Sequence, residues 1–402
     1  MTPDAHHENL PLNSRCQDHG RPLRVLHCPL VALYQPPLLS QGLRSIGVAA
    51  DSMVFDKGED GWLSFQEDIN LGLDRCSSWR KIWRLGRFFL RAANHYDVFH
   101  FHSGRTLFPL WVDSRWSPIP RSLRPHLAWL RRWDFVDLSL LKKKGKKLVF
   151  SFWGCDIRKP TRLRQYPDYI CNDHCRPFER QCTTPFRKNL LRALKKYGDA
   201  VLVSGDLIQS WPAAHWFPNV IDLSEWNPHR IAAEIPEKYR VSKKDNILIL
   251  HAFANGDSRG DHKGSPYIKA VVESMAQQGL PVEFIDLDGI PIQDVKYYQI
   301  QADIVVDQFR SGCYGSFAME SMALERPVVG WIIPGIYEPH GEVPPIVNSN
   351  LKDLQKVLTS LVLSHPRREA IGRESRQYVE RVHDHHKVAQ QLKQIYESLY
   401  AN

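Results

Sequence analysis

The sequence predicts an α/β protein made of doubly wound parallel sheets, with one such domain in each half of the chain. A unit of strand, loop, helix and strand recurs at residues 23–55 and 302–334, and this succession begins a doubly wound sheet. The 402 residues suffice for two domains of ordinary size. A hydrophobic content of 43% with 24% charged residues is typical of a globular protein, and no run of eighteen apolar residues could span a bilayer.

In the first half, short apolar runs predict the strands and amphipathic runs predict the helices between them. Strands are predicted at 23–28, 48–55, 96–102, 147–152 and 199–204, and helices at 36–46, 79–93, 137–144 and 186–197. The loop 29–37 follows the carboxyl end of the first strand, where doubly wound folds bind ligands.

The second half repeats this alternation and then ends in helices. Strands are predicted at 246–252, 282–286, 303–306 and 327–333, and helices at 265–278, 291–299, 317–324, 351–363, 367–382 and 387–400.

Residues 310–324 carry the first functional signal. The loop Arg310 to Gly315 holds two glycines and feeds a helix, whose N-terminus offers free N–H groups to an anion. Glu320 lies just inside this helix. An acid there can accept hydrogen bonds from a ribose while a diphosphate lies on the turn, which predicts a nucleotide site.

Residues 314–329, YGSFAMESMALERPVV, resemble the donor-nucleotide segment of the retaining glycosyltransferases of the GT-B fold, glycosyltransferase family 4. Two acids eight positions apart are usual in that family. Glu320 matches the second acid, whereas Gly312 stands where the first is expected. Because the first acid contacts the donor sugar in the family, this departure leaves the identity of the donor open.

Three further segments carry the resemblance. In NGDSRGDHKG, Arg259 and Lys263 match the basic pair that grips the donor diphosphate in the family. YDVFHFH resembles the family element that supplies a histidine to the sugar, here His100 or His102, and alternation places both on one face of the strand. In the segment that is often H-G-x-D-x-R in relatives, Trp153 replaces the histidine.

The resemblance implies a GT-B fold of two Rossmann-like domains facing a cleft. It places an acceptor domain at 21–218, a donor domain at 219–384 and a last helix, 385–402, that crosses back to the first domain. The implied catalytic residues are Arg259, Lys263, His102 and His100, and the implied nucleotide-binding residues are Glu320, Gly312, Tyr314, Gly315, Ser316, Phe317, Lys263, Arg259 and Asp307.

The implied reaction transfers a hexose-type sugar, with retention, from a UDP- or GDP-sugar. The acceptor is a glycan, a lipid-linked molecule or a small molecule. No catalytic metal is expected, because two cations and a helix N-terminus can neutralise the leaving diphosphate. Two alternatives stay open: a sugar-nucleotide or polysaccharide-binding protein without turnover, and a GT-B-type sugar-nucleotide epimerase.

Charge is unevenly distributed along the chain. Residues 1–218 hold 33 Lys and Arg against 20 Asp and Glu, a net charge of +13, whereas the remainder carries −4. This asymmetry indicates an anionic partner for the first half. No recognised nucleic-acid-reading motif accompanies it, so a nucleic-acid partner is not expected.

Two basic segments of the first half are rich in tryptophan. Residues 79–93 predict an amphipathic helix, with Trp79, Ile82, Trp83, Leu85, Phe89 and Leu90 on an apolar face and Arg80, Lys81, Arg84, Arg87 and Arg91 on a cationic one. Residues 110–133 add five arginines and four tryptophans. The helix is interpreted either as an ordinary packed element with a solvated basic side or as an interfacial helix on anionic lipid. Residues 110–133 are interpreted as an acceptor or membrane contact.

The cysteines allow a structural zinc site. Cys171, His174, Cys175 and Cys182 fall within twelve residues and could hold a tetrahedral zinc, although their spacing is equally that of reduced thiols in a loop. Residues 1–20 are polar, lack the apolar core of a signal peptide and are predicted to be disordered. We therefore expect a cytoplasmic protein, which the basic segments would hold peripherally at a membrane.

Overall fold

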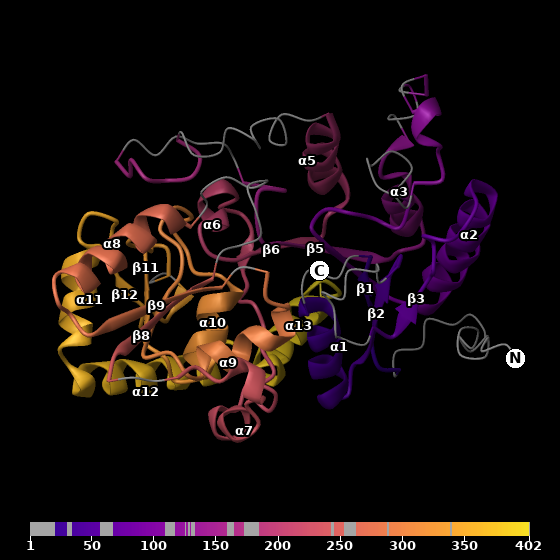
Figure 1. The fold of residues 1–402 in the computed structure, drawn as a ribbon. Coiled ribbons are helices and arrows are strands. Elements are labelled where there is room, and N and C mark those ends of the chain that lie inside the picture. The colour runs from indigo at the N-terminus through magenta and orange to yellow at the C-terminus, as the bar shows by residue number, and fades with distance from the viewer. Residues whose placement is uncertain are drawn as a thin grey trace, which may run out of the picture.

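Two parallel sheets, one in each half of the chain, organise the protein in its computed structural model (Figure 1). The structure describes residues 21–29, 34–56, 67–108, 117–124, 126–127, 129, 133–158, 165–172, 185–242, 245–252, 263–287, 289–337 and 340–401. Every strand pair among these residues is parallel. The predicted doubly wound α/β class is therefore confirmed.

The first sheet has the strand order β3-β2-β1-β4-β5-β6-β7. Its strands are β1 (Arg24–Cys28), β2 (Ala49–Val54), β3 (Ile69–Asn70), β4 (Val98–His102), β5 (Lys147–Phe152), β6 (Ala200–Val203) and β7 (His215–Trp216). Its helices are α1 (Gln35–Ser45), α2 (Ser78–His95), α3 (Val136–Lys143), α5 (Pro185–Tyr197) and α6 (Leu207–Ser210), with a 3-10 turn, η1, at Arg121–Leu123. The two-residue strands β3 and β7 were not predicted, because they are too short to show a pattern.

Alternation along the strands divides this domain into two layers. Val25 of β1 and Val98 of β4 pack on the same core side as α1. Their neighbours Leu26 and Phe99 pack on the opposite side with α2, α3 and α5. A central parallel strand is buried on both faces in this way, which is why its sequence is almost continuously apolar.

The second sheet has the order β12-β11-β10-β8-β9. Its strands are β8 (Ile247–Ala252), β9 (Val282–Leu287), β10 (Ile304–Val306), β11 (Val328–Gly330) and β12 (Val347–Asn348). The surrounding helices are α7 (Pro228–Ala233), α8 (Ser265–Gln277), α9 (Val295–Gln299), α10 (Ser316–Ala323), α11 (Leu354–Val362) and α12 (His365–Val382), with 3-10 turns η3 (Glu237–Tyr239) and η5 (Ile292–Asp294). The predicted helix 291–299 is thus a 3-10 turn followed by one turn of α-helix, and the predicted strand 327–333 keeps only three residues.

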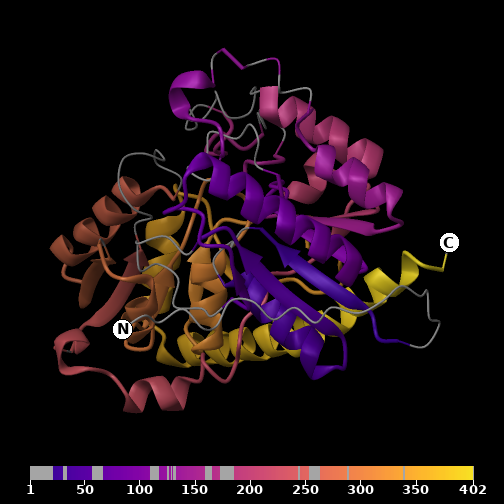
Figure 2. The same cartoon turned by 90° about the vertical axis from the view of Figure 1, so that its right-hand side faces the viewer.

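The last helix, α13 (His385–Ser398), returns to the first domain and packs against α1, as the two views show (Figures 1 and 2). Beside its start, the backbone carbonyl of Ile221 accepts from the His385 N–H, and the Ile221 N–H donates to the His383 carbonyl. The connection that leaves the first domain near Ile221 therefore lies beside the one that returns to it near His383. One buried cluster of apolar residues extends across both domains. In the described part of the chain, no helix is long and apolar enough to cross a membrane.

Candidate functional site

Glu320 lies where the two domains meet. It is only 6% exposed on α10, and its Oε1 accepts a 2.7 Å hydrogen bond from the hydroxyl of Tyr34. Tyr34 belongs to the first domain, immediately before α1, and is itself buried. Glu320 is therefore not a surface charge of its helix: it is a buried acid paired across the domain interface.

Burial sets the protonation chemistry of this pair. Loss of solvent raises the pKa of Glu320 from 4.5 to about 7, and the nearby positive charge of Lys263 partly opposes that rise. Burial, followed by the charge of Glu320, raises the pKa of Tyr34 well above its usual value. The tyrosine therefore stays the donor, and the carboxyl of Glu320 titrates near neutral pH.

Lys263 and Asp307 form the second part of the site. Lys263 immediately precedes Gly264, the residue that caps α8, and its Nζ lies 3.2 Å from Oδ1 of Asp307. Asp307 follows β10, and its Oδ2 accepts from the N–H of Gly315, 3.4 Å away. The ammonium of Lys263 also lies over the ring of Phe317, 4.8 Å from its centre. Asp307 thus ties Lys263 to the loop that begins α10.

The glycine at position 312 is required by the local backbone. Gly312 has φ +69°, a conformation that favours glycine. A Cβ added there would lie 2.5 Å from Cδ1 of Ile333. An acid therefore cannot replace Gly312 unless this loop and Ile333 move. The local backbone conformation thus explains why glycine stands where the family has its first acid.

Tyr314, in the loop that precedes α10, contacts the connection between the two domains. Its hydroxyl is 2.9 Å from that of Tyr378 and 2.8 Å from Nε2 of His383. Nδ1 of His383 donates to the carbonyl of Asn219 at 2.7 Å. The tyrosine hydroxyl is thus engaged by the connection between the domains.

Three buried histidines line one face of the first sheet. His100 and His102 share this face, as alternation along β4 predicted, and Nε2 of His102 lies 3.0 Å from Nδ1 of His27 on β1. The two nitrogens of His100 hydrogen-bond with Tyr396 of α13 and Ser151 of β5, each at 2.6 Å. Burial lowers the pKa of all three, so they are neutral at physiological pH.

His102 is additionally covered by Trp153. The two rings stack at 5.1 Å with only 3° between their planes, and His102 is fully buried. Among the described residues, His27, His100 and His102 form a group that could geometrically hold a metal ion. Because both nitrogens of His100 already have protein partners, the group fits a hydrogen-bonded network better.

Asp206 is a buried carboxylate whose hydrogen-bond partners the sequence did not indicate. Its carboxylate accepts two hydrogen bonds from the guanidinium of Arg158, at 2.7 and 2.8 Å, and one from Tyr169 at 2.9 Å. Cys313 of the glycine-bearing loop donates to it from the other domain at 3.4 Å. Asp206 therefore joins the two domains beside the loop that precedes α10.

Several predicted site residues lie outside the described part of the chain. Arg259 falls in residues 253–262, and His174, Cys175 and Cys182 fall in residues 173–184. Cys171 is described, is partly buried and is not in a disulfide. The diphosphate role of Arg259 and the zinc site therefore stay predictions.

The structure resembles solved glycosyltransferase structures. The sucrose-phosphate synthase tll1590 from Thermosynechococcus elongatus matches with a TM-score of 0.55 at 14% identity, over 95% of this chain and 100% of that one. The catalytic domain of starch synthase IV from Arabidopsis thaliana matches with 0.55 at 10% identity, over 95% and 100%. Anabaena Alr3699/HepE in complex with UDP matches with 0.51 at 12% identity, over 94% and 100%.

These likenesses show that the chain has the GT-B fold of two Rossmann-like domains. By sequence, no family model and no curated protein matches it. The structure brings Glu320, Lys263, Asp307 and the 312–317 loop together at the carboxyl edge of the second sheet. It adds Tyr34, for which the sequence offered one signal: its position in the loop 29–37 after the first strand.

Proposed function

We propose that the protein is a glycosyltransferase that moves a sugar from a nucleoside-diphosphate sugar to an acceptor. One observation carries the proposal: Glu320, Lys263 and Asp307 gather at the carboxyl edge of the donor-side sheet, the edge at which GT-B-like α/β sheets bind nucleotides. The UDP bound by HepE, and the UDP-glucose of a second HepE structure with a TM-score of 0.50, support a nucleotide-sugar donor, which we propose is a UDP- or GDP-sugar.

Each residue has a defined part in the proposed reaction. The carboxylate of Glu320 accepts hydrogen bonds from the ribose hydroxyls, in place of the one from Tyr34. Lys263, together with Arg259, neutralises the diphosphate as the bond between sugar carbon and phosphate oxygen breaks. The N-terminus of α8, just after Lys263, adds its dipole to this stabilisation.

The acceptor oxygen then bonds to the same sugar carbon and passes its proton to the leaving diphosphate. Retention at that carbon follows from the resemblance to family 4, in which the acceptor enters on the face that the nucleotide leaves. His102 is assigned to the sugar, and we expect Trp153 to move from its ring when the donor binds. The acceptor class proposed is a glycan, a lipid-linked molecule or a small molecule, used in the cytoplasm.

A thermal-shift panel of UDP-, GDP-, ADP- and dTDP-sugars tests the proposal. A ligand that binds only the folded protein raises its melting temperature, so sugars of one nucleotide should stabilise the protein and the others should not. That donor should then be consumed in the presence of acceptor glycans. If none of the four classes raises the melting temperature at millimolar concentration, the donor site is wrongly assigned.

A nucleotide-sugar-binding protein without turnover is the second candidate. The observations that favour it are Gly312, where an acid would require the loop and Ile333 to move, and the complete burial of His102 under Trp153. Both candidates predict stabilisation by one nucleotide class. Release of free nucleoside diphosphate from a bound donor separates them, and the identity of the sugar product separates a transferase from an epimerase.

A further inference from the structure

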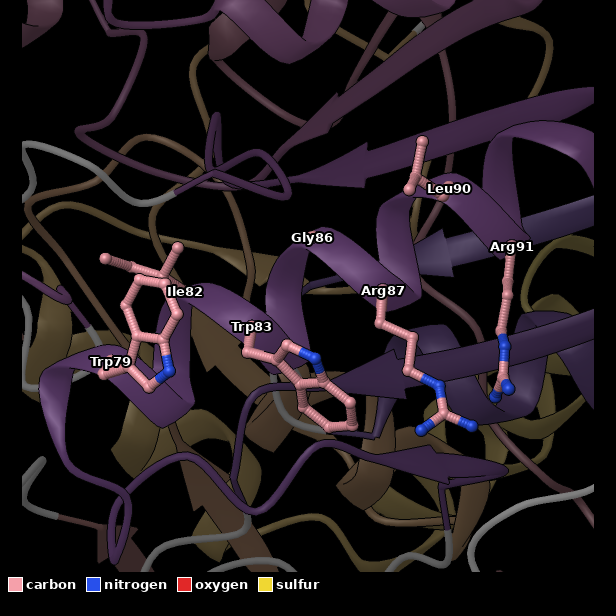
Figure 3. A pocket seen from close by; sticks show the side chains of 7 residues that line it. All are labelled: Trp79, Ile82, Trp83, Gly86, Arg87, Leu90 and Arg91. Atoms are coloured by element: carbon pink, nitrogen blue, oxygen red, sulfur yellow. The ribbon is translucent and has the colours of Figure 1, made fainter.

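Helix α2 carries two apolar faces, and only one of them packs against the protein. Leu85, Phe88, Phe89, Ala92 and Ala93 are buried in the core of the first domain. The outer face exposes 74% of Trp79, 50% of Ile82, 53% of Trp83 and 61% of Leu90. These four recur with helical spacing, so they line one outer side of α2 (Figure 3).

The sequence pattern predicts a single apolar face made of six of the seven large apolar residues of 79–93, all except Phe88. The structure divides them, because the core contact of α2 is centred on Phe88 and Phe89 and leaves both tryptophans outside. At Gly86 no side chain separates Trp83 from Leu90, and a Cβ there would meet nothing within 4 Å. Glycine is less favourable than alanine inside a helix, and no neighbouring atom requires a glycine at position 86.

The cations of α2 are divided in the same way. Lys81 is 9% exposed, and Arg84 donates to the carbonyls of Leu71 and Gly72 at 2.9 and 3.0 Å, so these two serve the fold. Arg80 is exposed, and Arg87 and Arg91 border the apolar groove. The guanidinium of Arg87 lies 5.1 Å from the centre of the Trp83 ring, which places a cation beside the aromatic face (Figure 3).

We propose that this outer face of α2, defined by Trp79, Ile82, Trp83, Arg87, Leu90 and Arg91, docks the protein on an anionic membrane surface. Tryptophan and arginine on one helix side suit the headgroup layer, where rings meet the acyl boundary and cations meet lipid phosphates. The rest of the domain has the matching charge, because residues 1–218 carry +13. Two further exposed tryptophans of this domain, Trp129 (54%) and Trp133 (49%), extend the same chemistry.

Charge argues against a second copy of the chain as the occupant. Two such faces packed together would bring the cations of Arg80, Arg87 and Arg91 against their own counterparts, which is unfavourable where water is excluded. A bilayer that contains acidic lipids offers an apolar layer and negative charge at once. Attachment through one such face is reversible, and salt weakens it.

Vesicle co-sedimentation of the full chain tests this docking surface. We expect binding to vesicles of phosphatidylcholine with 30% phosphatidylserine in 50 mM salt, and a loss of at least about tenfold on raising salt to 500 mM. Pure phosphatidylcholine vesicles should bind at least about tenfold less. The surface is independent of the donor site, so the result stands whether or not the proposed transfer activity is found.

Two variants and a matched control assign the binding to α2. Replacing Arg80, Arg87 and Arg91 with Gln should weaken binding by at least tenfold, because each surface cation is worth about fivefold. Trp79→Ala with Trp83→Ala should also weaken it about tenfold while the melting temperature stays unchanged, since both rings are exposed. The control replaces three exposed lysines of the other domain, Lys269, Lys352 and Lys356, with Gln, removing equal charge without loss of binding.

Three results would overturn the proposal. The first is the absence of binding to acidic vesicles in 50 mM salt. The second is binding that the α2 variants leave intact, which would assign the basic surface elsewhere. The third is a concentration-dependent dimer, seen by sedimentation velocity and abolished by the tryptophan variant, without vesicle binding; this outcome would make the face a contact between copies of the chain.

Discussion

Tyr34 and Glu320 join the two domains through a hydrogen bond of 2.7 Å, although 286 positions separate them in the chain. The adjacent residue Gln35 holds the interdomain connection, donating to the carbonyl of Val220 at 3.0 Å and accepting from its N–H at 2.7 Å. The start of α1 thus contacts both the connection and the acid assigned to the ribose. Donor binding and closure of the two domains are therefore expected to be coupled, because both involve Glu320.

The first prediction separates the roles of Glu320 and Tyr34. Glu320→Gln should weaken donor binding by about 1–3 kcal/mol, the contribution of a charged hydrogen bond. Tyr34→Phe removes the competing protein donor, so it should leave donor affinity equal or higher while lowering the free energy of unfolding by about 1–3 kcal/mol. Isothermal calorimetry and urea unfolding measure the two quantities. Equal donor affinity in Glu320→Gln and the native protein would contradict the ribose assignment.

The second prediction concerns pH. The pKa of Glu320 is raised from 4.5 to about 7 in the folded state, so the folded protein holds this proton more tightly than the unfolded chain does. The stability from the neutral carboxyl is complete below pH 4.5 and is lost as pH rises through 7, by about 3 kcal/mol in all.

The change in unfolding free energy caused by Glu320→Gln measures this contribution without interference from other titrating groups. The free energy of unfolding of the variant, relative to that of the native protein, should be higher at pH 8 than at pH 5 by about 3 kcal/mol. A difference that does not vary between these two pH values would show that Glu320 is not a buried, perturbed acid.

The third prediction addresses Lys263. Lys263→Ala should lower turnover at saturating donor by at least tenfold, because negative charge grows on the leaving diphosphate in the transition state. Its loss also leaves Asp307, only 2% exposed, without its ion-pair partner. Lys263→Met, which keeps the contact with Phe317 but not the charge, serves as the control for packing. Full turnover in either variant would show that Lys263 does not stabilise the leaving diphosphate.

The fourth prediction concerns the polar contacts around Asp206. Asp206→Ala leaves the buried guanidinium of Arg158 without its carboxylate, so the free energy of unfolding should fall by about 3–5 kcal/mol. Replacing Arg158 with Met as well should recover part of this loss, because no buried charge then remains. Chemical denaturation of the single and double variants provides the measurement, and a single variant as stable as the native protein would contradict the assignment.

The fifth prediction concerns zinc. If Cys171, His174, Cys175 and Cys182 hold the metal, elemental analysis of protein purified without chelator should find about one zinc per chain, since structural zinc binds too tightly to be lost. Cys175→Ser should then release it. Less than about a tenth of an equivalent would favour reduced thiols.

Most of the longer strands and helices could be predicted from the sequence, because each depends on residues close together in the chain. Apolar runs bounded by turn residues located β1, β4, β5, β8 and β10 to within a residue or two. The succession of a strand, two glycines and a helix bearing Glu320 was predicted by the same local logic, and the nucleotide site assigned to it stays a prediction. The alternation of His100 and His102 with phenylalanines likewise placed both imidazoles on one face.

Only the tertiary structure decided which partners these residues meet. Tyr34 meets Glu320, and Asp206 meets Cys313, because the two domains pack across one buried cluster. No local pattern in the sequence encodes a pairing between residues that lie so far apart in the chain. The outer tryptophans of α2 illustrate the same limit. Hydrophobic spacing shows that a helix has apolar sides, but the sheet beneath it determines which side is buried and which stays exposed, since burial depends on the geometry of the packed neighbours.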